Sequence, residues 1–265
     1  MEASQNVEIQ RFEAGRWHKL SGGVVGEGAV RLHVNGQDVA SLLCTPRELD
    51  LLALGFLAGE GIIKSTDDVR LLKVCPSGAC VDVWLRRADF VAPARLTITS
   101  GCGGGVTFTD LSGMAAPVLV EAHASVRQIE GLMGALMQAG QLYQEVRGVH
   151  TSALARGEAL LAVAEDVGRH NTIDKVRGRC LVESIPTAGG ILLTTGRISS
   201  EMLTKAARMG TPIVASRTSL TSLSVALATA WHITLVGYVR HGSLNVYAGH
   251  ERLVADEGEK AYAHA

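Results

Sequence analysis

The alternation of short apolar runs with helix-forming runs between residues 190 and 240 constrains the fold of this chain more than any other feature. Residues 191–195, 213–216 and 233–239 are mostly apolar, whereas residues 200–209 and 220–230 have the length and composition of helices. Strands that alternate with helices across short loops form parallel sheets with helical crossovers. The sequence therefore predicts an α/β domain in the C-terminal half of the chain.

Three further elements of the same domain are expected upstream, starting near Pro117. Ser125 and Gln128 match a capping box for a helix that stops at Gly140. A hairpin over residues 151–164 and a helix over about 171–181 follow. The apolar side chains of the first helix recur at the spacing of an amphipathic helix, and they are Ile129, Leu132, Met133, Leu136 and Met137.

The first 115 residues predict a region rich in β-strands with one helix. Asn35-Gly36, a dipeptide typical of a type I′ turn, joins two apolar runs, and a second hairpin is expected over 71–85. Thr45-Pro46-Arg47-Glu48 matches a capping box with proline at the first helical position, which predicts a helix from Pro46 to Gly59. We therefore divide the chain into a β-rich region over 1–115 and an α/β domain over 116–265.

Charge and hydropathy exclude several classes of protein. The 25 Lys and Arg residues against 26 Asp and Glu residues give a net charge of −1, which is a poor match for nucleic acid or anionic membranes. The uncharged stretch at 218–239 is interrupted by Ser, Thr, His and Gly, so it fits a helix followed by a strand better than a membrane span. No basic segment followed by an apolar run opens the sequence, so we expect a cytoplasmic protein with reduced thiols.

Each of the three predicted parallel strands is followed by an arginine, namely Arg197, Arg217 and Arg240. In open α/β sheets, ligands bind beyond the C-terminal ends of the strands. Guanidinium groups and helix N-termini at such an edge suit a ligand that carries phosphate or pyrophosphate. The alternative is that these arginines are solvated loop residues. No Walker A motif is present, and the glycine loop at 101–105 does not complete a dinucleotide fingerprint.

The densest polar cluster of the chain is Glu-Asp-Val-Gly-Arg-His-Asn at residues 165–171, where an apolar strand meets a predicted helix. His150 precedes the strand that pairs with it. Two interpretations remain open. Either Asp166 or Asn171 caps the helix and the rest is solvated, or the loop presents an acid, a base and an arginine to a ligand.

Cys102 differs from the other four cysteines because Ser100 and four glycines surround it. Nothing in this loop offers apolar burial, so its thiol is expected to be reachable and to act as a nucleophile or a carrier. Cys44 and Cys180 lie in apolar runs and are expected to be buried. Cys75 and Cys80 could hold a metal or form a disulfide, but without a second ligand pair we favour reduced structural thiols.

Two enzyme classes can be weighed against these residues. A zinc deaminase needs His-x-Glu and Pro-Cys-x-x-Cys, but His150 is followed by Thr151-Ser152 and no Cys-x-x-Cys exists. A cysteine hydrolase would pair Cys102 with His150 or His170, which requires one of these imidazoles to lie beside the thiol in the fold.

Taken together, these motifs resemble the FdhD family of sulfur carrier proteins (sulfurtransferases) required for formate dehydrogenase activity. The resemblance covers roughly residues 10–255 and is carried by the Cys102 loop and by residues 55–63, 148–153, 165–171, 194–202 and 215–217. It implies a C-terminal domain of three layers similar to that of cytidine deaminases but without their zinc, and a homodimer.

The resemblance also implies an activity. Proteins of this family accept sulfur from a cysteine desulfurase as a cysteine persulfide and transfer it to the molybdenum cofactor, bis(molybdopterin guanine dinucleotide), for formate dehydrogenase. Cys102 would carry the persulfide, and no resident metal is expected. The cofactor-binding residues would be Tyr238, Val239, Arg240, His241, Gly242 and Ser243, together with Arg197, Arg217, Arg169 and His170.

One departure from the family pattern concerns this chemistry. The family loop usually reads Cys-Gly-x-Cys, whereas here Gly105 occupies the position of the second cysteine. A lone Cys102 cannot close an internal disulfide, but it can still carry a persulfide that an outside reductant or direct attack discharges. The alternative is a binding chaperone for the same cofactor that has lost sulfur transfer.

Overall fold

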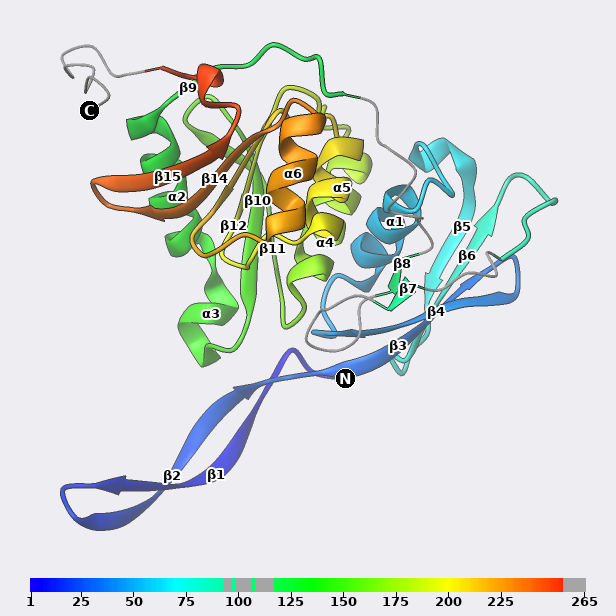
Figure 1. Cartoon of the computed structure of the whole chain (residues 1–265). Coiled ribbons are helices and arrows are strands. Elements are labelled where there is room, and N and C mark those ends of the chain that lie inside the picture. Colours follow the sequence, from blue (N-terminus) through cyan, green and yellow to red (C-terminus); the bar gives the residue numbers. More distant parts are fainter. Residues whose placement is uncertain (93–96, 99–105, 108–116, 255–265) are drawn as a thin grey trace.

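The computed structural model describes residues 1–92, 97–98, 106–107 and 117–254, and it contains a β-rich N-terminal part and a larger sheet flanked by helices (Figure 1). Cys102 and the expected domain boundary at residue 115 both lie outside the described residues. The α/β class and the three-layer C-terminal arrangement are confirmed by the sheet and its helices.

The C-terminal sheet has six strands in the order β11-β10-β12-β13-β14-β15. The three strands predicted from the alternation are parallel, with Ile191 opposite Ile213 and Ile213 opposite Thr234. They are β12 (Ile191–Thr194), β13 (Ile213–Ser216) and β14 (Thr234–Arg240). Three antiparallel pairings complete the sheet, through β10 (His150–Arg156), β11 (Ala159–Asp166) and the edge strand β15 (Ser243–Ala248).

Helices cover both faces of this sheet (Figure 1). On one face, α2 (Val126–Ala139) packs four of its five predicted apolar side chains, all except Met137, against β10, β12, β13 and β14. The opposite face carries α4 (Arg169–Val182), α5 (Ser200–Arg208) and α6 (Ser222–Ala230), which form a second core with the sheet. Ser125 caps α2 by accepting a hydrogen bond from the Gln128 amide at 3.1 Å, as the sequence predicts. The short helix α3 (Gln141–Val146), which was not predicted, follows α2.

The N-terminal part has its own apolar core beneath a four-stranded sheet in the order β4-β3-β6-β5. Asn35 and Gly36 have φ angles of 49° and 79°, so both adopt the left-handed conformation that a type I′ turn requires. The strands are β3 (Gly28–Val34), β4 (Gln37–Cys44), β5 (Val69–Val74) and β6 (Cys80–Leu85), and both predicted hairpins are confirmed.

The helix of this part, α1 (Leu49–Gly59), begins three residues later than the predicted start at Pro46. Glu48 stands at its N-cap with φ 56° and makes no capping hydrogen bond. The Thr45 hydroxyl, which the sequence assigned to a cap, instead accepts a hydrogen bond from the Val167 amide at 3.1 Å. A contact between distant segments therefore replaces the local cap.

The two parts meet where α1 crosses α4. A Cβ atom at Gly55 would lie 1.7 Å from the Asp174 carbonyl oxygen, and one at Gly178 would lie 2.0 Å from the Leu51 carbonyl oxygen. Only glycine allows backbones to approach this closely. The glycines of these two helices therefore fix the distance between the two parts.

A long two-stranded ribbon, β1 (Ser4–Glu13) paired with β2 (Arg16–Val25), projects from the body of the molecule (Figure 1). The sequence analysis did not assign it. The remaining elements are short: η1 (Thr66–Asp68), β7 (Thr97–Ile98), β8 (Val106–Thr107), β9 (Ala124–Ser125), η2 (His250–Arg252) and β16 (Leu253–Val254).

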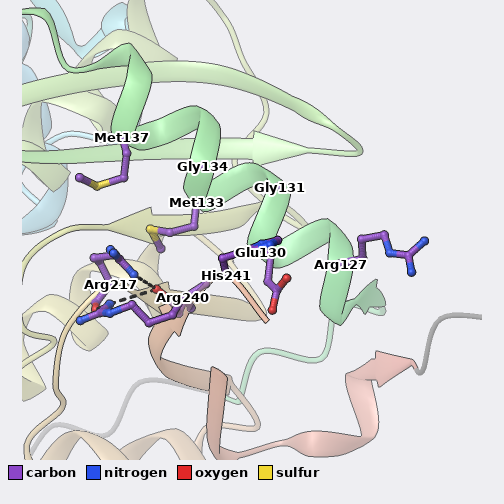
Figure 2. A pocket seen from close by; sticks show the side chains of 10 residues that line it. Arg127, Glu130, Gly131, Met133, Gly134, Met137, Arg217, Arg240 and His241 are labelled. Carbon is purple, nitrogen blue, oxygen red and sulfur yellow. Dashed lines mark hydrogen bonds between the residues drawn. The ribbon is translucent and has the colours of Figure 1, made fainter. Parts of the chain in front are cut away.

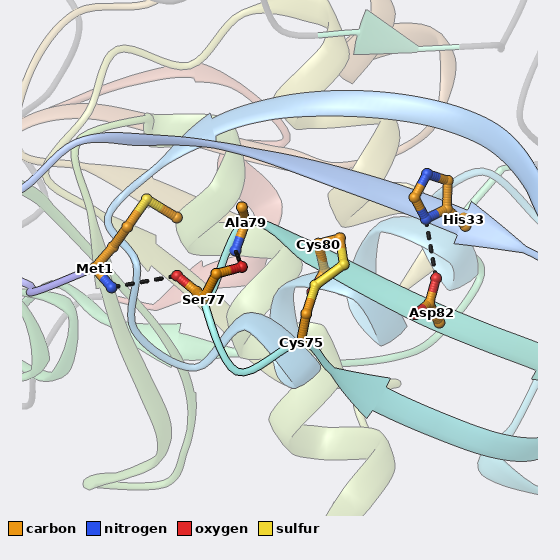
Figure 3. Close-up of a disulfide and its surroundings, with 7 residues drawn as sticks. All are labelled: Met1, His33, Cys75, Ser77, Ala79, Cys80 and Asp82. Atoms are coloured by element: carbon orange, nitrogen blue, oxygen red, sulfur yellow. Dashed lines mark hydrogen bonds and ion pairs between the residues drawn. A yellow bond between two sulfur atoms is a disulfide. The ribbon is translucent and has the colours of Figure 1, made fainter.

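Cys75 and Cys80 form a disulfide at the ends of β5 and β6 (Figure 3), so the expectation of reduced thiols at these positions is wrong. The hairpin register brings their Cα atoms to 5.5 Å, within the range that a disulfide spans. Cys44 and Cys180 are buried as expected, and burial raises their pKa values to about 12 and about 11. None of the described helices is both long and apolar enough to cross a membrane.

Candidate functional site

The C-terminal ends of four parallel strands meet at one edge of the large sheet. Because β10 is antiparallel to both of its neighbours, β11 runs in the same direction as β12, β13 and β14. Arg169 follows β11, Arg197 follows β12, Arg217 follows β13, and Arg240 ends β14. The parallel strands that the sequence predicts, each followed by an arginine at the same edge of the sheet, are therefore present.

A cavity of about 540 Å³ opens at this edge, between α2 and the ends of β13 and β14 (Figure 2). Its volume lies within the usual range for small-molecule sites. The lining residues are Arg127, Glu130, Gly131, Met133, Gly134, Met137, Arg217, Val239, Arg240 and His241.

Two arginines are held side by side in this cavity by backbone carbonyls (Figure 2). The Val239 carbonyl accepts hydrogen bonds from Arg217 Nη1 at 2.6 Å and from Arg240 Nη1 at 3.1 Å. Arg240 Nη1 also donates to the Arg217 carbonyl. Among the described residues, no carboxylate lies within 4.0 Å of either guanidinium.

The pair therefore carries positive charge without a matching acid. Desolvation and the neighbouring Arg240 charge lower the pKa of Arg217, because two like charges disfavour each other. Fixed guanidinium groups in this state are well suited to an anion that presents several oxygens, such as a phosphate.

Four of the ten residues expected to bind the cofactor line this cavity, and six do not. Val239, Arg240, His241 and Arg217 line the cavity. Three others do not line it, namely Tyr238 on β14, Gly242 in the following turn and Ser243 at the start of β15. The remaining three, Arg169, His170 and Arg197, belong to the ends of β11 and β12 and are not in its wall.

Arg169 and His170 lie in the first turn of α4, on the face of the sheet opposite α2, and both are buried. His170 Nε2 lies 3.1 Å from Ser199 Oγ and 3.0 Å from Glu201 Oε2, both near the start of α5. A Cβ atom at Gly196 would lie 2.8 Å from Arg169 Cβ and 3.4 Å from His150 Nδ1, so this cluster is closely packed. Arg197 is exposed beside it.

Burial, reinforced by the charges of Lys205 and Arg169, lowers the pKa of His170 to about 2. Burial and Arg169 likewise lower the pKa of His150. Both imidazoles are therefore neutral near pH 7, when each can donate from one ring nitrogen and accept at the other.

The remainder of the 165–171 cluster is structural. Glu165 accepts hydrogen bonds from the Leu142 and Tyr143 amides, each at 2.9 Å, and so caps α3. Asp166 accepts from the Thr45 amide at 3.1 Å and from Asn171 Nδ2 at 2.9 Å. The interpretation in which Asp166 or Asn171 caps the following helix and the rest is solvated is therefore wrong, because the N-cap of α4 is Gly168, without a side-chain hydrogen bond, and Arg169 and His170 are buried.

Sequence reasoning missed the contribution of α2 to the cavity. Glu130, Gly131, Gly134 and Met137 lie on one face of this helix, at the spacing of successive turns. Met137 had been named only as part of the apolar stripe of this helix. The available signal was the presence of two glycines inside a helix, because glycine is unfavourable there unless something requires it.

Neither the Cys102 thiol nor its environment falls within the described residues. Within those residues, no group of three or more His, Cys, Asp or Glu side chains is placed to hold a metal ion. The site that the structure does describe is therefore the arginine-bearing cavity and, on the other face of the sheet, the buried His170 cluster.

Known proteins resemble this chain over nearly its whole length. Sulfur carrier protein FdhD from Staphylococcus haemolyticus (strain JCSC1435) is 32% identical over 258 residues, which cover 96% of this chain and 98% of that protein. Sulfur carrier protein FdhD from Staphylococcus aureus (strain MRSA252) is 33% identical over 261 residues, or 97% and 98% of the two chains.

Similarity in structure agrees with similarity in sequence. A crystal structure from Desulfotalea psychrophila, described as a formate dehydrogenase accessory protein, superposes with a TM-score of 0.81 at 28% identity and covers 95% of this chain and all of that one. The family profile of FdhD/NarQ matches residues 25–254. The chain therefore belongs to the FdhD/NarQ family.

Proposed function

We propose that this protein is a sulfur carrier for formate dehydrogenase that accepts sulfur on Cys102 and transfers it to the molybdenum cofactor. Its family and its relatives, which are named sulfur carrier proteins, support the general role. The observation that carries the proposal is the cavity in which Arg217 and Arg240 lie together without a carboxylate partner among the described residues.

The cofactor that the family resemblance implies, bis(molybdopterin guanine dinucleotide), is here a substrate. It carries two pyrophosphate groups, and the paired guanidiniums offer the rigid donors that such groups need. In this proposal Arg217 and Arg240 hold one pyrophosphate, while Val239 and His241 close the cavity around it. Tyr238, Gly242, Ser243, Arg169, His170 and Arg197 are proposed to contact other parts of the same large substrate.

Loading of Cys102 is redox-neutral. The Cys102 thiolate attacks the terminal sulfur of a persulfide on a cysteine desulfurase, the sulfur–sulfur bond of the donor breaks, and the donor cysteine leaves as a thiolate. Cys102 then holds the persulfide. The protein is proposed to work as a cytoplasmic homodimer, so that two cavities would serve the two dinucleotide arms.

Release of the terminal sulfur as sulfide consumes two electrons. Gly105 stands where the family pattern has a second cysteine, so this chain lacks a neighbouring thiol in that position. An external thiol would supply the electrons by forming a mixed disulfide with Cys102 as sulfide leaves, and a second thiol would regenerate Cys102. Sulfur release should therefore depend on the concentration of added thiol.

The test is mass spectrometry of the reduced protein after incubation with a cysteine desulfurase and cysteine, beside Cys102→Ala. We expect one added sulfur on the Cys102 peptide of the wild type and none in the variant. Absence of added sulfur, with cofactor binding retained, would instead support a chaperone that binds the cofactor without transferring sulfur. Retention of formate dehydrogenase maturation by Cys102→Ala would contradict the role of this cysteine.

A further inference from the structure

The disulfide between Cys75 and Cys80 plays no part in the proposed function, and the hairpin that carries it is closed without it. The Cys75 amide donates to the Cys80 carbonyl at 3.0 Å, and the Gly78 amide donates to the Cys75 carbonyl at 2.8 Å. Beyond this turn, the ladder between β5 and β6 continues the hairpin. The shape of the hairpin therefore does not depend on the bond between the two sulfurs.

A disulfide in this position also adds little to stability. The cysteines are five positions apart, so the bond encloses only residues 76–79. In the chain-entropy account, the stabilisation from a cross-link falls as the enclosed loop becomes shorter. In the cytoplasm, where this protein is proposed to work, thiols are kept reduced, and the disulfides that form there are mostly catalytic or redox-sensing. Both arguments point away from a structural staple.

Both cysteines lie on the outer face of the N-terminal sheet, away from its core. Along β6, Cys80 belongs to the partly exposed set of side chains that alternates with buried valines and a leucine. Cys75 lies opposite Cys80 at the end of β5, the edge strand of this sheet (Figure 3). Both residues are half-buried, whereas Cys44 and Cys180 are buried. A nucleophile in solution therefore reaches this pair from the open edge of the sheet.

Two cations share the outer face with the pair. Arg31 on β3 is exposed and lies directly opposite Cys80 in the parallel register. Lys73 is exposed two residues before Cys75, so the two side chains are on the same face of β5. Positive charge beside a cysteine stabilises its thiolate and makes that thiolate a better leaving group. This surroundings favours exchange at the disulfide.

The carboxylate of this face does not cancel the two cations. Asp82, two residues beyond Cys80, has its Oδ1 atom 2.9 Å from His33 Nδ1 (Figure 3). Among the described residues, no carboxylate oxygen lies within 4.0 Å of the charged nitrogens of Arg31 or Lys73. Both cations are therefore available to a thiolate formed beside them.

We propose that Cys75 and Cys80 form a reversible dithiol–disulfide pair that exchanges with low-molecular thiols. In reduction, an external thiolate attacks the Cys75 sulfur at the sheet edge, the bond between the two sulfurs breaks, and Cys80 leaves as a thiolate beside Arg31. A second external thiolate attacks the external sulfur of the mixed disulfide and releases Cys75. Two electrons pass from two thiols, which become one disulfide, and their protons reach the cysteine thiolates through water.

Oxidation by an external disulfide is the reverse of these steps. The activity goes beyond the proposed function, because neither cysteine belongs to the arginine cavity or to sulfur loading at Cys102. It gives the N-terminal sheet a covalent state that follows the ratio of reduced to oxidised thiol around the protein.

The experiment uses the full-length Cys102→Ala variant, so that this thiol does not contribute. The native protein is incubated at varied ratios of reduced to oxidised glutathione, quenched with acid, alkylated in denaturant and analysed by peptide mass spectrometry. We expect Cys75 and Cys80 to be alkylated in excess reduced glutathione and protected in excess oxidised glutathione, with one curve approached from both sides. Cys44 and Cys180 should be alkylated throughout, as an internal control.

Two results would overturn the proposal. A bond that stays oxidised in excess reduced glutathione until urea unfolds the protein would be a structural staple. Thiols that stay reduced in excess oxidised glutathione would show that the pair forms no exchangeable disulfide. Cys75→Ser/Cys80→Ser should unfold at nearly the same urea concentration as the oxidised parent, and a clearly lower midpoint would also identify a staple.

Arg31→Gln and Lys73→Gln test the role of the charges. Each should slow reduction by glutathione several-fold, because the leaving thiolate loses a neighbouring cation. Arg11→Gln, which removes an exposed cation from the ribbon, should leave the rate unchanged. Equal rates in all of these proteins would contradict the assignment of Arg31 and Lys73 to the reacting sulfurs.

Discussion

At the residue scale, the charges buried between the two parts of the chain have a clear structural purpose. Lys175 and Asp166 are both fully buried, with 2.7 Å between Nζ and Oδ2. Lys175 also donates to the carbonyls of Thr45 and Glu165, each at 3.2 Å. The contact with Thr45 joins α4 to the segment that follows β4, 130 residues away in the chain, so the buried pair helps to fix how α4 sits against the end of β4.

Lys175→Met should therefore be strongly destabilising. The substitution keeps the approximate volume of the side chain but leaves the Asp166 carboxylate buried without its cation, which costs about 3–5 kcal/mol. Urea unfolding followed by circular dichroism measures this loss. The double variant Lys175→Met/Asp166→Asn should recover part of it, and a single variant within about 0.5 kcal/mol of the wild type would contradict this account.

The buried His170 predicts how stability depends on pH. Its pKa is lowered from 6.5 to about 2 in the folded protein, so between these values the unfolded chain binds more protons than the folded one. Stability should therefore fall as the pH drops below about 6.5, by up to about 1.4 kcal/mol per pH unit from this residue.

Urea unfolding at pH 7.5, 6.5 and 5.5 checks this expectation against His170→Gln, in which the pH dependence should be weaker. Some dependence should remain because the pKa of His150 is lowered as well. Equal slopes in the two proteins would mean that Glu201 keeps His170 protonated in the folded state.

At the element scale, the crossing of α1 and α4 is the tightest contact between two helices described above. It depends on Gly55 and Gly178, because at each of these positions the backbone of the other helix occupies the space that a side chain would fill. This contact places the Leu43–Thr45 backbone next to the loop that begins α4. The arrangement of these helices thus fixes the side of the sheet that carries Arg169 and His170.

Gly55→Ala should lose several kcal/mol of unfolding free energy, because its Cβ would lie 1.7 Å from a backbone carbonyl that cannot move aside. Gly131→Ala makes the same chemical change in a helix where the added atom meets nothing, and it should gain about 0.5–1 kcal/mol. Similar effects of the two substitutions in urea unfolding would contradict the close helix crossing.

Elements whose signals are local could be predicted from the sequence, and those decided by distant contacts could not. The Asn35-Gly36 hairpin and the parallel strands follow from turn chemistry and alternation, and the structure has both. The start of α1 was misplaced because Thr45 bonds to Val167 rather than to its own helix. The arginines at the sheet edge could be predicted because each of them directly follows a predicted strand. Glu130 was missed because the apolar periodicity of α2 identifies only the face of the helix that packs on the core.

At the scale of the whole molecule, separate cores in the two parts are joined by a buried interface. The N-terminal core and the two cores of the large sheet share few side chains, and α1 packed on α4 connects them. The hydrogen bonds of Asp166 and Lys175 to Thr45 and the glycine contacts of α1 and α4 stabilise this interface, and neither persists once the two parts move apart. The ribbon formed by β1 and β2 is the main element that stands outside these cores.

The protein should therefore unfold in one cooperative step although it contains more than one core. We expect a single calorimetric transition in which the calorimetric and van't Hoff enthalpies agree. Gly55→Ala should broaden or split this transition by weakening the interface. Two well-separated transitions in the wild type would show that the two parts unfold independently.

The two glycines inside α2, Gly131 and Gly134, have a consequence for the lifetime of the protein. Each weakens the helix by about 1 kcal/mol relative to alanine, so α2 opens locally more often than a helix of ordinary composition. Proteases cut a folded chain in proportion to the population of such open states. A ligand that fills the cavity beside α2 would suppress that opening, so a cell that degrades its proteins continuously would remove empty copies before loaded ones.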